Sequence, residues 1–159
     1  MKQIILLFAA MLLFSCKSPA QDSKKEEFAV VKTEAEWKEQ LTPEQFYILR
    51  EAGTERPFSS PLLNIKKEGT YVCAACSTPL FKSEHKFDSG TGWPSFDREI
   101  EGNVAFSTDY NIGIARTEEH CATCGGHLGH VFNDGPQETT GKRHCINGDA
   151  LKFVAENEE

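Results

Sequence analysis

Gly69-Thr-Tyr-Val-Cys-Ala-Ala-Cys76 joins a short β-prone run to two cysteines that are separated by two residues. Cys121-Ala-Thr-Cys124 repeats this pair farther along the chain, and Gly125-Gly126 suits the sharp reversal that follows it. Each pair can bind one metal ion from a single tight turn. Because 44 residues, from Ser77 to His120, separate the pairs, a shared metal would join two distant segments instead of forming a compact finger.

Four thiolates form a closed tetrahedral zinc site, which leaves no coordination position for a substrate. The predicted ligands of this structural Zn²⁺ are Cys73, Cys76, Cys121 and Cys124. One alternative is two redox-active pairs or two disulfides, as in many exported proteins. Another is an open catalytic metal that also takes His127 or His130 as ligands. No organic cofactor is predicted.

Short β-prone runs and turn residues dominate the chain after residue 53. The runs at 69–73, 104–106, 112–114 and 151–154 are predicted strands, and Asn147-Gly148 is a hairpin signal. The chain has 12 Gly and 7 Pro in 159 residues, which is consistent with many turns. We therefore predict a small, mainly antiparallel β domain.

Two short helices are predicted at the start of this domain. Thr33 and Glu36 have the spacing of a capping box, and Thr42 and Gln45 repeat it with a proline at the first helical position. Gly53 can end the second helix.

The first residues have the pattern of a secretory leader. The apolar stretch 4–14 is too short to span a membrane comfortably. Leu13-Phe14-Ser15-Cys16 resembles a bacterial lipobox, in which the cysteine is acylated and becomes the mature N-terminus. Ordinary cleavage after Ala20 is the alternative. Several acyl chains would give stable membrane anchoring.

This interpretation divides the chain into three parts. They are a lipoprotein signal peptide at 1–15, a flexible tether at 16–31 and a globular domain at 32–156. The tether is polar and charged and has no hydrophobic period. We expect a membrane-anchored lipoprotein of the bacterial cell envelope, on the periplasmic or outer-membrane side. The net charge of −7 argues against a nucleic-acid partner.

Cys145 is the unpaired cysteine of the predicted domain. Removal of the leader leaves five cysteines, and an odd number excludes a fully disulfide-paired framework. If 143–147 is a strand, Arg143, Cys145 and Asn147 share one face. A cation and an amide beside a thiol favour the reactive thiolate. An inert buried thiol is the alternative, and spacing alone does not decide between them.

Further motifs follow one another along residues 33–153. They are Gly53-Thr-Glu-Arg-Pro-Phe58, Phe87-Asp-Ser-Gly-Thr-Gly-Trp-Pro-Ser-Phe96, His127-Leu-Gly-His-Val-Phe132, Asp134-Gly-Pro136 and Arg143-His-Cys-Ile-Asn147. Together with the two cysteine pairs they resemble the B-type methionine sulfoxide reductases. The resemblance implies two small antiparallel sheets in a β-tent-like arrangement, a structural zinc, and reduction of the R epimer of methionine sulfoxide.

The resemblance also implies roles for the reacting groups. A sulfoxide has an electrophilic sulfur and a basic oxygen, so it needs a thiolate to attack and an acid to protonate the departing oxygen. Cys145 is the implied nucleophile, and its product is a sulfenic acid. His130 is the implied acid, with His127 assisting. Without the resemblance, both histidines would be interpreted as surface or core-edge residues.

The remaining implied roles concern substrate contact and positioning. Trp93 and Phe132 would contact the substrate. Asn147, Arg143 and Asp134 would position the cysteine, the histidines and bound water. Taken alone, a Trp before Pro is more often a core residue, and an Arg–Asp pair is equally structural.

Thr91 stands where many members of this family carry a second, resolving cysteine. We therefore expect the oxidised enzyme to be reduced directly by a thioredoxin-like protein or another thiol. The expected substrate is methionine sulfoxide, either free or in oxidised proteins. Two other function classes stay open: a non-enzymatic zinc-binding interaction module, and a thiol–disulfide oxidoreductase that would need a metal-free cysteine pair.

Overall fold

The computed structural model describes residues 27–156. The predicted signal peptide at 1–15, Cys16 and most of the predicted tether lie outside the described residues. Within 27–156, no helix has the length and apolar character needed to cross a bilayer. Two residues of the predicted tether pack against the domain: the N–H of Val30 donates to the carbonyl of Thr123 at 2.9 Å, and the ring of Phe28 lies 6.0 Å from that of His120.

Two short helices, α1 (Glu34–Gln40) and α2 (Pro43–Glu51), open the domain as predicted. Both capping boxes are formed. In each, the threonine side chain accepts from the backbone N–H three residues later, and the side chain of that later residue accepts from the backbone N–H of the threonine. These reciprocal bonds satisfy backbone donors that have no partner within the helix. The caps therefore set where each helix begins.

The end of α2 differs from the prediction. Ala52, not Gly53, adopts the left-handed conformation, with φ of 53°. Gly53 serves another purpose, because a Cβ at this position would lie 2.3 Å from the ring of Tyr47. The glycine is thus needed for close packing and not for its backbone angles.

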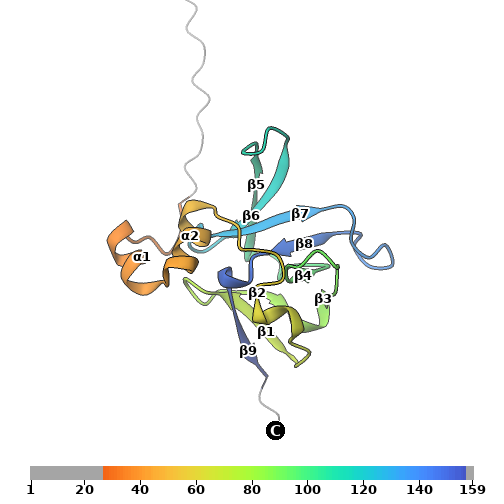
Figure 1. Cartoon of the computed structure of the whole chain (residues 1–159). Coiled ribbons are helices and arrows are strands. Elements are labelled where there is room, and N and C mark those ends of the chain that lie inside the picture. Colours follow the sequence, from red (N-terminus) through yellow and green to blue (C-terminus); the bar gives the residue numbers. More distant parts are fainter. Residues whose placement is uncertain (1–26, 157–159) are drawn as a thin grey trace, which may run out of the picture.

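Two antiparallel sheets make up the rest of the domain (Figure 1), as the resemblance implied. The smaller has the order β2 (Pro79–Lys82), β1 (Gly69–Cys73) and β9 (Leu151–Ala155). The larger has the order β3 (Lys86–Phe87), β4 (Ser95–Phe96), β8 (Arg143–Ile146), β7 (His127–Phe132), β6 (Arg116–Cys121) and β5 (Val104–Asp109). Short 3₁₀ helices lie at η1 (Pro61–Asn64), η2 (Ser83–His85) and η3 (Gly148–Ala150).

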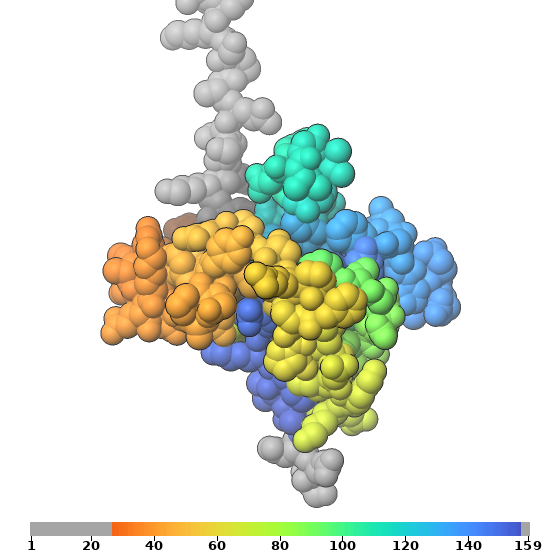
Figure 2. Space-filling model, viewed as in Figure 1, coloured from red at the N-terminus to blue at the C-terminus, as the bar shows by residue number. Residues whose placement is uncertain are grey.

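Two local predictions were wrong because tertiary context overrides propensity. Residues 112–114 do not form a strand; they form the turn between β5 and β6, where Gly113 has φ of 82°. This hairpin projects from the body of the molecule (Figure 2). Asn147-Gly148 does not form a hairpin turn either. It leads through η3 from β8 in the large sheet to β9 in the small one.

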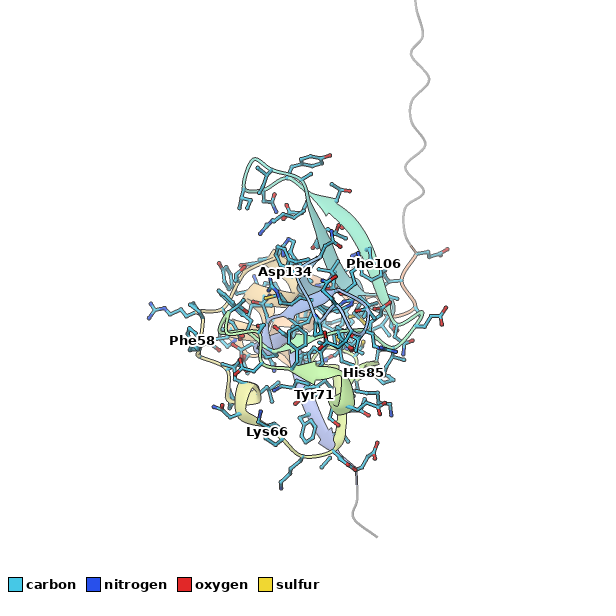
Figure 3. The ribbon with its side chains drawn as sticks, turned by 90° about the vertical axis from the view of Figure 1, so that its right-hand side faces the viewer. Phe58, Lys66, Tyr71, His85, Phe106 and Asp134 are labelled. Carbon is cyan, nitrogen blue, oxygen red and sulfur yellow. The ribbon has the colours of Figure 1, made fainter. Side chains whose placement is uncertain are left out.

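Aromatic side chains fill the core between the sheets. Tyr71 and Phe81 of the small sheet both contact Phe96 of the large sheet, with ring centroids 4.9 and 4.4 Å away. All three side chains are fully buried. Figure 3 shows the wider arrangement, with Phe106 on the projecting hairpin and Lys66 towards the opposite end of the molecule. Such aromatic contacts between the sheets fix how they pack.

Candidate active site

A cavity of about 150 Å³ collects most of the predicted catalytic and substrate-binding residues. Its lining includes Trp93, His130, Phe132, Cys145 and Asn147. Ligand pockets usually measure about 300–1,000 Å³, so this cavity suits one unbranched side chain better than a large cofactor. A larger groove of about 440 Å³, lined by η2 and the residues before β1, contains none of these residues.

Cys145 lies in the middle of the large sheet. On β8 it is paired with Ser95 of β4 on one side and with His130 of β7 on the other. At Gly129 the two strands β7 and β8 approach so closely that a Cβ would lie 2.1 Å from the carbonyl oxygen of Cys145. A glycine is therefore required there to keep β7 against the cysteine.

Burial controls the protonation of Cys145. The half-buried position raises the pKa of this thiol, and the nearby Arg143 guanidinium opposes that rise. Arg143 thus acts in the direction expected from the sequence, but desolvation outweighs it. In the absence of substrate, the thiol is the favoured form at neutral pH.

His130 is held by an acidic residue that the sequence analysis missed. Its Nε2 lies 2.8 Å from Oδ2 of Asp109, at the end of β5. Asp109 also accepts from the backbone N–H of Asn111 at 2.6 Å and pairs with Arg116. The Asn111 and His130 hydrogen bonds, with Arg116, keep the pKa of Asp109 well below its usual range. A carboxylate only accepts hydrogen bonds, so Nε2 of His130 carries a proton.

His127 lies behind His130 and outside the cavity lining. The side chain is buried, and its Nδ1 lies 2.6 Å from Oε1 of Glu118. Burial lowers the pKa of His127, against the effect of Glu118. The two imidazole rings are 5.5 Å apart. His127 can therefore support His130 by packing and charge, without contacting a ligand in the cavity.

Arg143 and Asp134 form a bidentate ion pair next to the cavity. Two nitrogens of Arg143 donate to the two carboxylate oxygens of Asp134, both at 2.9 Å. The guanidinium also lies 4.5 Å from the centre of the Phe132 ring. Neither Arg143 nor Asp134 lines the cavity, so the pair orients Phe132 and places positive charge near Cys145.

Glu55 connects the two other cavity residues. Trp93 donates from Nε1 to the carbonyl of Glu55 at 3.2 Å, and the backbone N–H of Glu55 donates to Oδ1 of Asn147 at 3.1 Å. Asn147 donates in turn to the carbonyl of Leu128 at 3.0 Å. The Glu55 carboxylate accepts from the N–H of Gly148 at 2.7 Å. One loop residue therefore holds both Trp93 and Asn147 in place.

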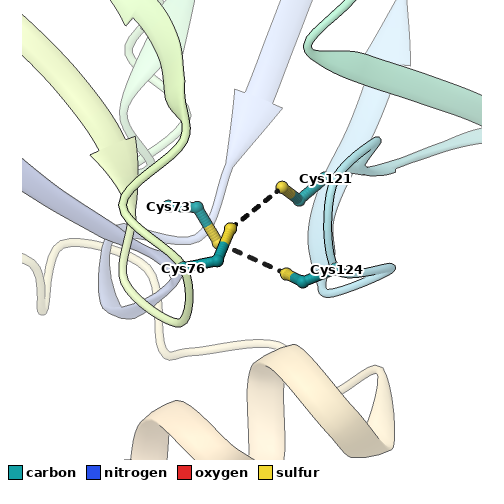
Figure 4. A group of neighbouring side chains, drawn as sticks. All are labelled: Cys73, Cys76, Cys121 and Cys124. Carbon is teal, nitrogen blue, oxygen red and sulfur yellow. Dashed lines mark hydrogen bonds between the residues drawn. The ribbon is translucent and has the colours of Figure 1, made fainter. Parts of the chain in front are cut away.

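The four predicted metal ligands converge at the junction of the two sheets (Figure 4). Their sulfur atoms all lie within 4.8 Å of one another, with Cys73–Cys124 at 3.8 Å and Cys76–Cys121 at 3.5 Å. A tetrahedral site with Zn–S bonds of about 2.3 Å requires sulfurs about 3.8 Å apart. The donor set and its spacing therefore fit a tetrahedral metal ion.

The two cysteine turns are built alike. The N–H of Ser77 donates to Cys73, and the N–H of Gly125 donates to Cys121, both to carbonyls at 2.8 Å. Ser77 and Gly125 also share the left-handed conformation, with φ of 61° and 68°. The described cysteines are free, so neither pair is closed by a disulfide.

Comparison with known proteins decides the family. The SelR domain model matches residues 41–155. The chain belongs to the SelR-domain family. This match spans both sheets, the four-cysteine cluster and every residue of the cavity lining.

Three relatives of this SelR domain each cover more than three quarters of the chain. "Peptide methionine sulfoxide reductase MsrB" of Agrobacterium fabrum is 56% identical over 125 residues, which are 78% of this chain and 92% of that protein. The protein of the same name from Leifsonia xyli is 49% identical over 86% of this chain and 99% of its own. "Peptide methionine sulfoxide reductase B1, chloroplastic" of Arabidopsis thaliana is 53% identical over 85% of this chain and 66% of its own.

A more distant likeness comes from a solved structure. The crystal structure of the Mis18 "Yippee-like" domain aligns with 58% of this chain and 100% of its own, at 17% identity and a TM-score of 0.45. This overlap is too limited to support a conclusion about the SelR domain.

Four residues of the site were missed by sequence reasoning. Asp109 and Glu118 hold the two histidines, Arg116 lines the cavity, and Glu55 holds Trp93 and Asn147. The signal for Glu55 was available, because it lies within the motif at 53–58. The other three lie on β5 and β6, and only the register of these strands brings them to the site.

Proposed function

We propose that this protein reduces methionine sulfoxide to methionine, with Cys145 as the nucleophile. The observation that carries the proposal is a half-buried thiol in a side-chain-sized cavity, opposite His130 and beside Trp93. The relatives named above are called peptide methionine sulfoxide reductases, and the chain is about half identical to them. Membership of the SelR-domain family supports the same reaction.

The reaction transfers one oxygen atom. The sulfur of Cys145 attacks the sulfoxide sulfur and forms an S–S bond, as the thiol proton passes to solvent. His130 donates a proton to the sulfoxide oxygen and regains one from solvent. The S–S bond and the S–O bond of the substrate then break as the hydroxyl moves to the Cys145 sulfur. The products are methionine and the sulfenic acid of Cys145. The net change is the transfer of one oxygen atom from the sulfoxide to the thiol. Cys145 is oxidised as the substrate is reduced, so this half-reaction needs no other reductant.

Regeneration then consumes two external thiols. One thiol attacks the sulfenic sulfur, releases water and leaves a mixed disulfide on Cys145. A second thiol reduces that disulfide and restores the free cysteine. Thr91, whose Oγ1 lies 4.0 Å from Sγ of Cys145, cannot replace the first thiol because a hydroxyl does not reduce a sulfenic acid. The reductant is a thioredoxin-like protein or another thiol.

Trp93 and Phe132 form the aromatic walls that receive the substrate methyl group and side chain. Arg143 orients Phe132 and favours the Cys145 thiolate, and Asp134 holds Arg143 in place. Asn147 fixes the end of β8. The R epimer of the sulfoxide is the proposed substrate, on the strength of the sequence resemblance. Free methionine sulfoxide and oxidised peptides are both within this proposal.

A structural Zn²⁺ is proposed at Cys73, Cys76, Cys121 and Cys124. The sulfur spacing and the matching turns support it. Bound there, the ion would be fully coordinated by protein and would stabilise the junction between the sheets. Cys145 lies on the large sheet, so this junction also keeps the reacting strand in place.

A lipid anchor at Cys16 is proposed for the N-terminus. Its support is the lipobox-like segment alone, which lies outside the described residues. The proposal assigns 1–15 to a signal peptide, 16–31 to a tether and 32–156 to the catalytic domain. It places the protein in the bacterial cell envelope, on the periplasmic or outer-membrane side.

The two alternative functions are not favoured. A zinc-binding interaction module would leave Cys145 and the cavity without a purpose. A thiol–disulfide oxidoreductase would need a metal-free cysteine pair, whereas the sulfurs of the two pairs meet each other at one centre.

A stereospecific assay tests the proposed function. Separate R and S epimers of a methionine sulfoxide derivative are incubated with the protein and a small dithiol, and methionine is quantified. We expect reduction of the R epimer by the wild type and none by Cys145→Ser, which nearly preserves side-chain volume. Substantial activity in the serine variant would remove Cys145 from the mechanism.

A further inference from the structure

A chain of hydroxyl groups connects Cys145 to the loop before β4. Oγ1 of Thr91 lies 4.0 Å from Sγ of Cys145, and Oγ of Ser89 lies 2.8 Å from Oγ1 of Thr91. The same Ser89 oxygen lies 2.8 Å from Oγ of Ser95. Ser95 is buried and donates to the carbonyl of Trp93 at 3.1 Å. The contacts therefore form one continuous series from the thiol to a backbone carbonyl.

The direction of these hydrogen bonds follows from a count of protons. A carbonyl oxygen only accepts, so the single hydroxyl proton of Ser95 goes to Trp93. Ser95 must then accept from Ser89, and Ser89 must accept from Thr91. Thr91 has no proton left to give and therefore accepts from the thiol of Cys145. Every contact is satisfied only while Cys145 keeps its proton.

We infer that the hydroxyl chain of Thr91 and the positioning residues Ser89 and Ser95 disfavours loss of the Cys145 proton, and that it reverses to stabilise the sulfur once the proton has left. In the reversed state Thr91 donates to the sulfur, Ser89 donates to Thr91, and Ser95 donates to Ser89. The carbonyl of Trp93 loses its donor. The inference rests on the proposed role of Cys145 as nucleophile.

Reversal of the hydrogen bonds along the chain is unfavourable, and this explains why the chain favours the protonated thiol. An unpaired carbonyl is unfavourable when it is shielded from water. While Cys145 is protonated, Ser95 can donate to the Trp93 carbonyl, so the Ser95 hydroxyl favours the thiol form of Cys145. Removal of the Ser95 hydroxyl leaves the Trp93 carbonyl without this donor in both states. The chain would then favour the thiolate, because Ser89 and Thr91 could donate towards it freely.

Other charged groups face Cys145 from the neighbouring strands. Arg143 on β8 favours the thiolate, Glu119 on β6 disfavours it, and His130 lies opposite on β7. These groups act whichever way the hydroxyls point. The effect of the hydroxyl chain on the ionisation of Cys145 is therefore measured by comparing variants that all retain Arg143, Glu119 and His130.

The test measures how fast iodoacetamide labels Cys145 as the pH is varied, without substrate. Labelling is followed by mass spectrometry of the peptide that contains Cys145. Ser95→Ala should move the profile to lower pH and speed labelling at pH 7 by about 3- to 10-fold, since one pKa unit is about tenfold in thiolate. Ser89→Ala should act in the same direction, because it also frees Thr91 to donate.

Thr91→Val disconnects the chain from the sulfur. The double variant Ser95→Ala/Thr91→Val should therefore behave like Thr91→Val alone, and Thr91→Ser should keep the wild-type profile. Ser83→Ala is the matched control, because the Ser83 hydroxyl accepts from the N–H of Gly69 in the small sheet. Its profile should not change.

Unshifted or higher-pH profiles in both Ser95→Ala and Ser89→Ala would overturn the inference. So would a double variant that keeps the full Ser95→Ala shift. Thermal unfolding of each variant establishes that it is folded, and Ser89→Ala provides the test if Ser95→Ala is not. Labelling requires no turnover, so the result is independent of whether the protein reduces methionine sulfoxide.

Discussion

His130 and Cys145 lie directly opposite each other in the β7–β8 ladder. Side chains of directly opposed residues project to the same face of a sheet, with Cβ atoms roughly 4.5–5.5 Å apart. An imidazole and a thiol therefore meet at one cavity before any substrate is present. Asp109 fixes the imidazole through its 2.8 Å contact with Nε2.

Replacement of His130 should slow the chemistry without disturbing the thiol. His130→Asn should lower kcat/KM for methionine sulfoxide by about 10²- to 10⁴-fold, the usual contribution of a positioned general acid. Asp109→Asn should cause a smaller loss, because the imidazole remains but is less well oriented. Steady-state kinetics with a dithiol measure both effects. A His130→Asn enzyme with wild-type kcat/KM would rule out this residue as the acid.

Replacement of Arg143 should make Cys145 harder to ionise. Burial already raises the pKa of this thiol and Arg143 opposes the rise, so removal of the cation raises the pKa further. Arg143→Met, which keeps an apolar contact with Phe132, should therefore shift thiol labelling to higher pH. Lys142→Met is the control, because the exposed Lys142 ammonium contacts Asn133 instead. A shift of the Arg143→Met profile to lower pH would contradict the assignment.

Loss of any of the four clustered cysteines should release the metal. In small metal-dependent folds, structural zinc contributes on the order of 10 kcal/mol; the aromatic core between these sheets should reduce the loss. Cys76→Ser and Cys124→Ser should contain no zinc and melt at lower temperature, while Cys145→Ser should keep both properties. Metal analysis and thermal unfolding provide the readouts. Wild-type melting in all the cluster variants would show that the assignment is wrong.

Turnover should leave Cys145 without an internal partner. After one equivalent of substrate, dimedone should label the sulfenic acid, and non-reducing mass analysis should show no new internal disulfide. Thr91→Cys should change this outcome, because a thiol beside Cys145 attacks the sulfenic acid intramolecularly. That variant should resist dimedone. Zinc release in proportion to sulfoxide consumed would instead identify a metal-ligand cysteine as the resolving group.

Cys16 should determine membrane attachment. Cys16→Ala should block acylation, and the variant should be recovered from the soluble fraction with a different N-terminal mass. Cys145→Ser, which leaves the leader intact, should remain attached. Fractionation and intact mass measure the two properties. Unchanged attachment and mass in Cys16→Ala would exclude the lipobox interpretation.

Structural features that depend on residues close together in the sequence could be predicted from the sequence alone. Both capping boxes depend on residues three positions apart, so Thr33 and Thr42 marked the starts of the helices correctly. The spacing of the cysteine pairs identified the four-sulfur cluster, because each pair acts through its own turn. The motif residues Trp93, His130 and Cys145 also meet at one cavity.

Long-range register and burial were decided only by the tertiary structure. Asp109 reaches His130 because β5, β6 and β7 pair in one specific register, which no local pattern encodes. The 112–114 segment has strand propensity, yet it becomes the turn that joins two of these strands. Arg143 pointed to an activated thiolate, but the burial of Cys145 reverses the balance. Desolvation depends on everything packed around a group, so it could not be derived from the residues beside it in the sequence.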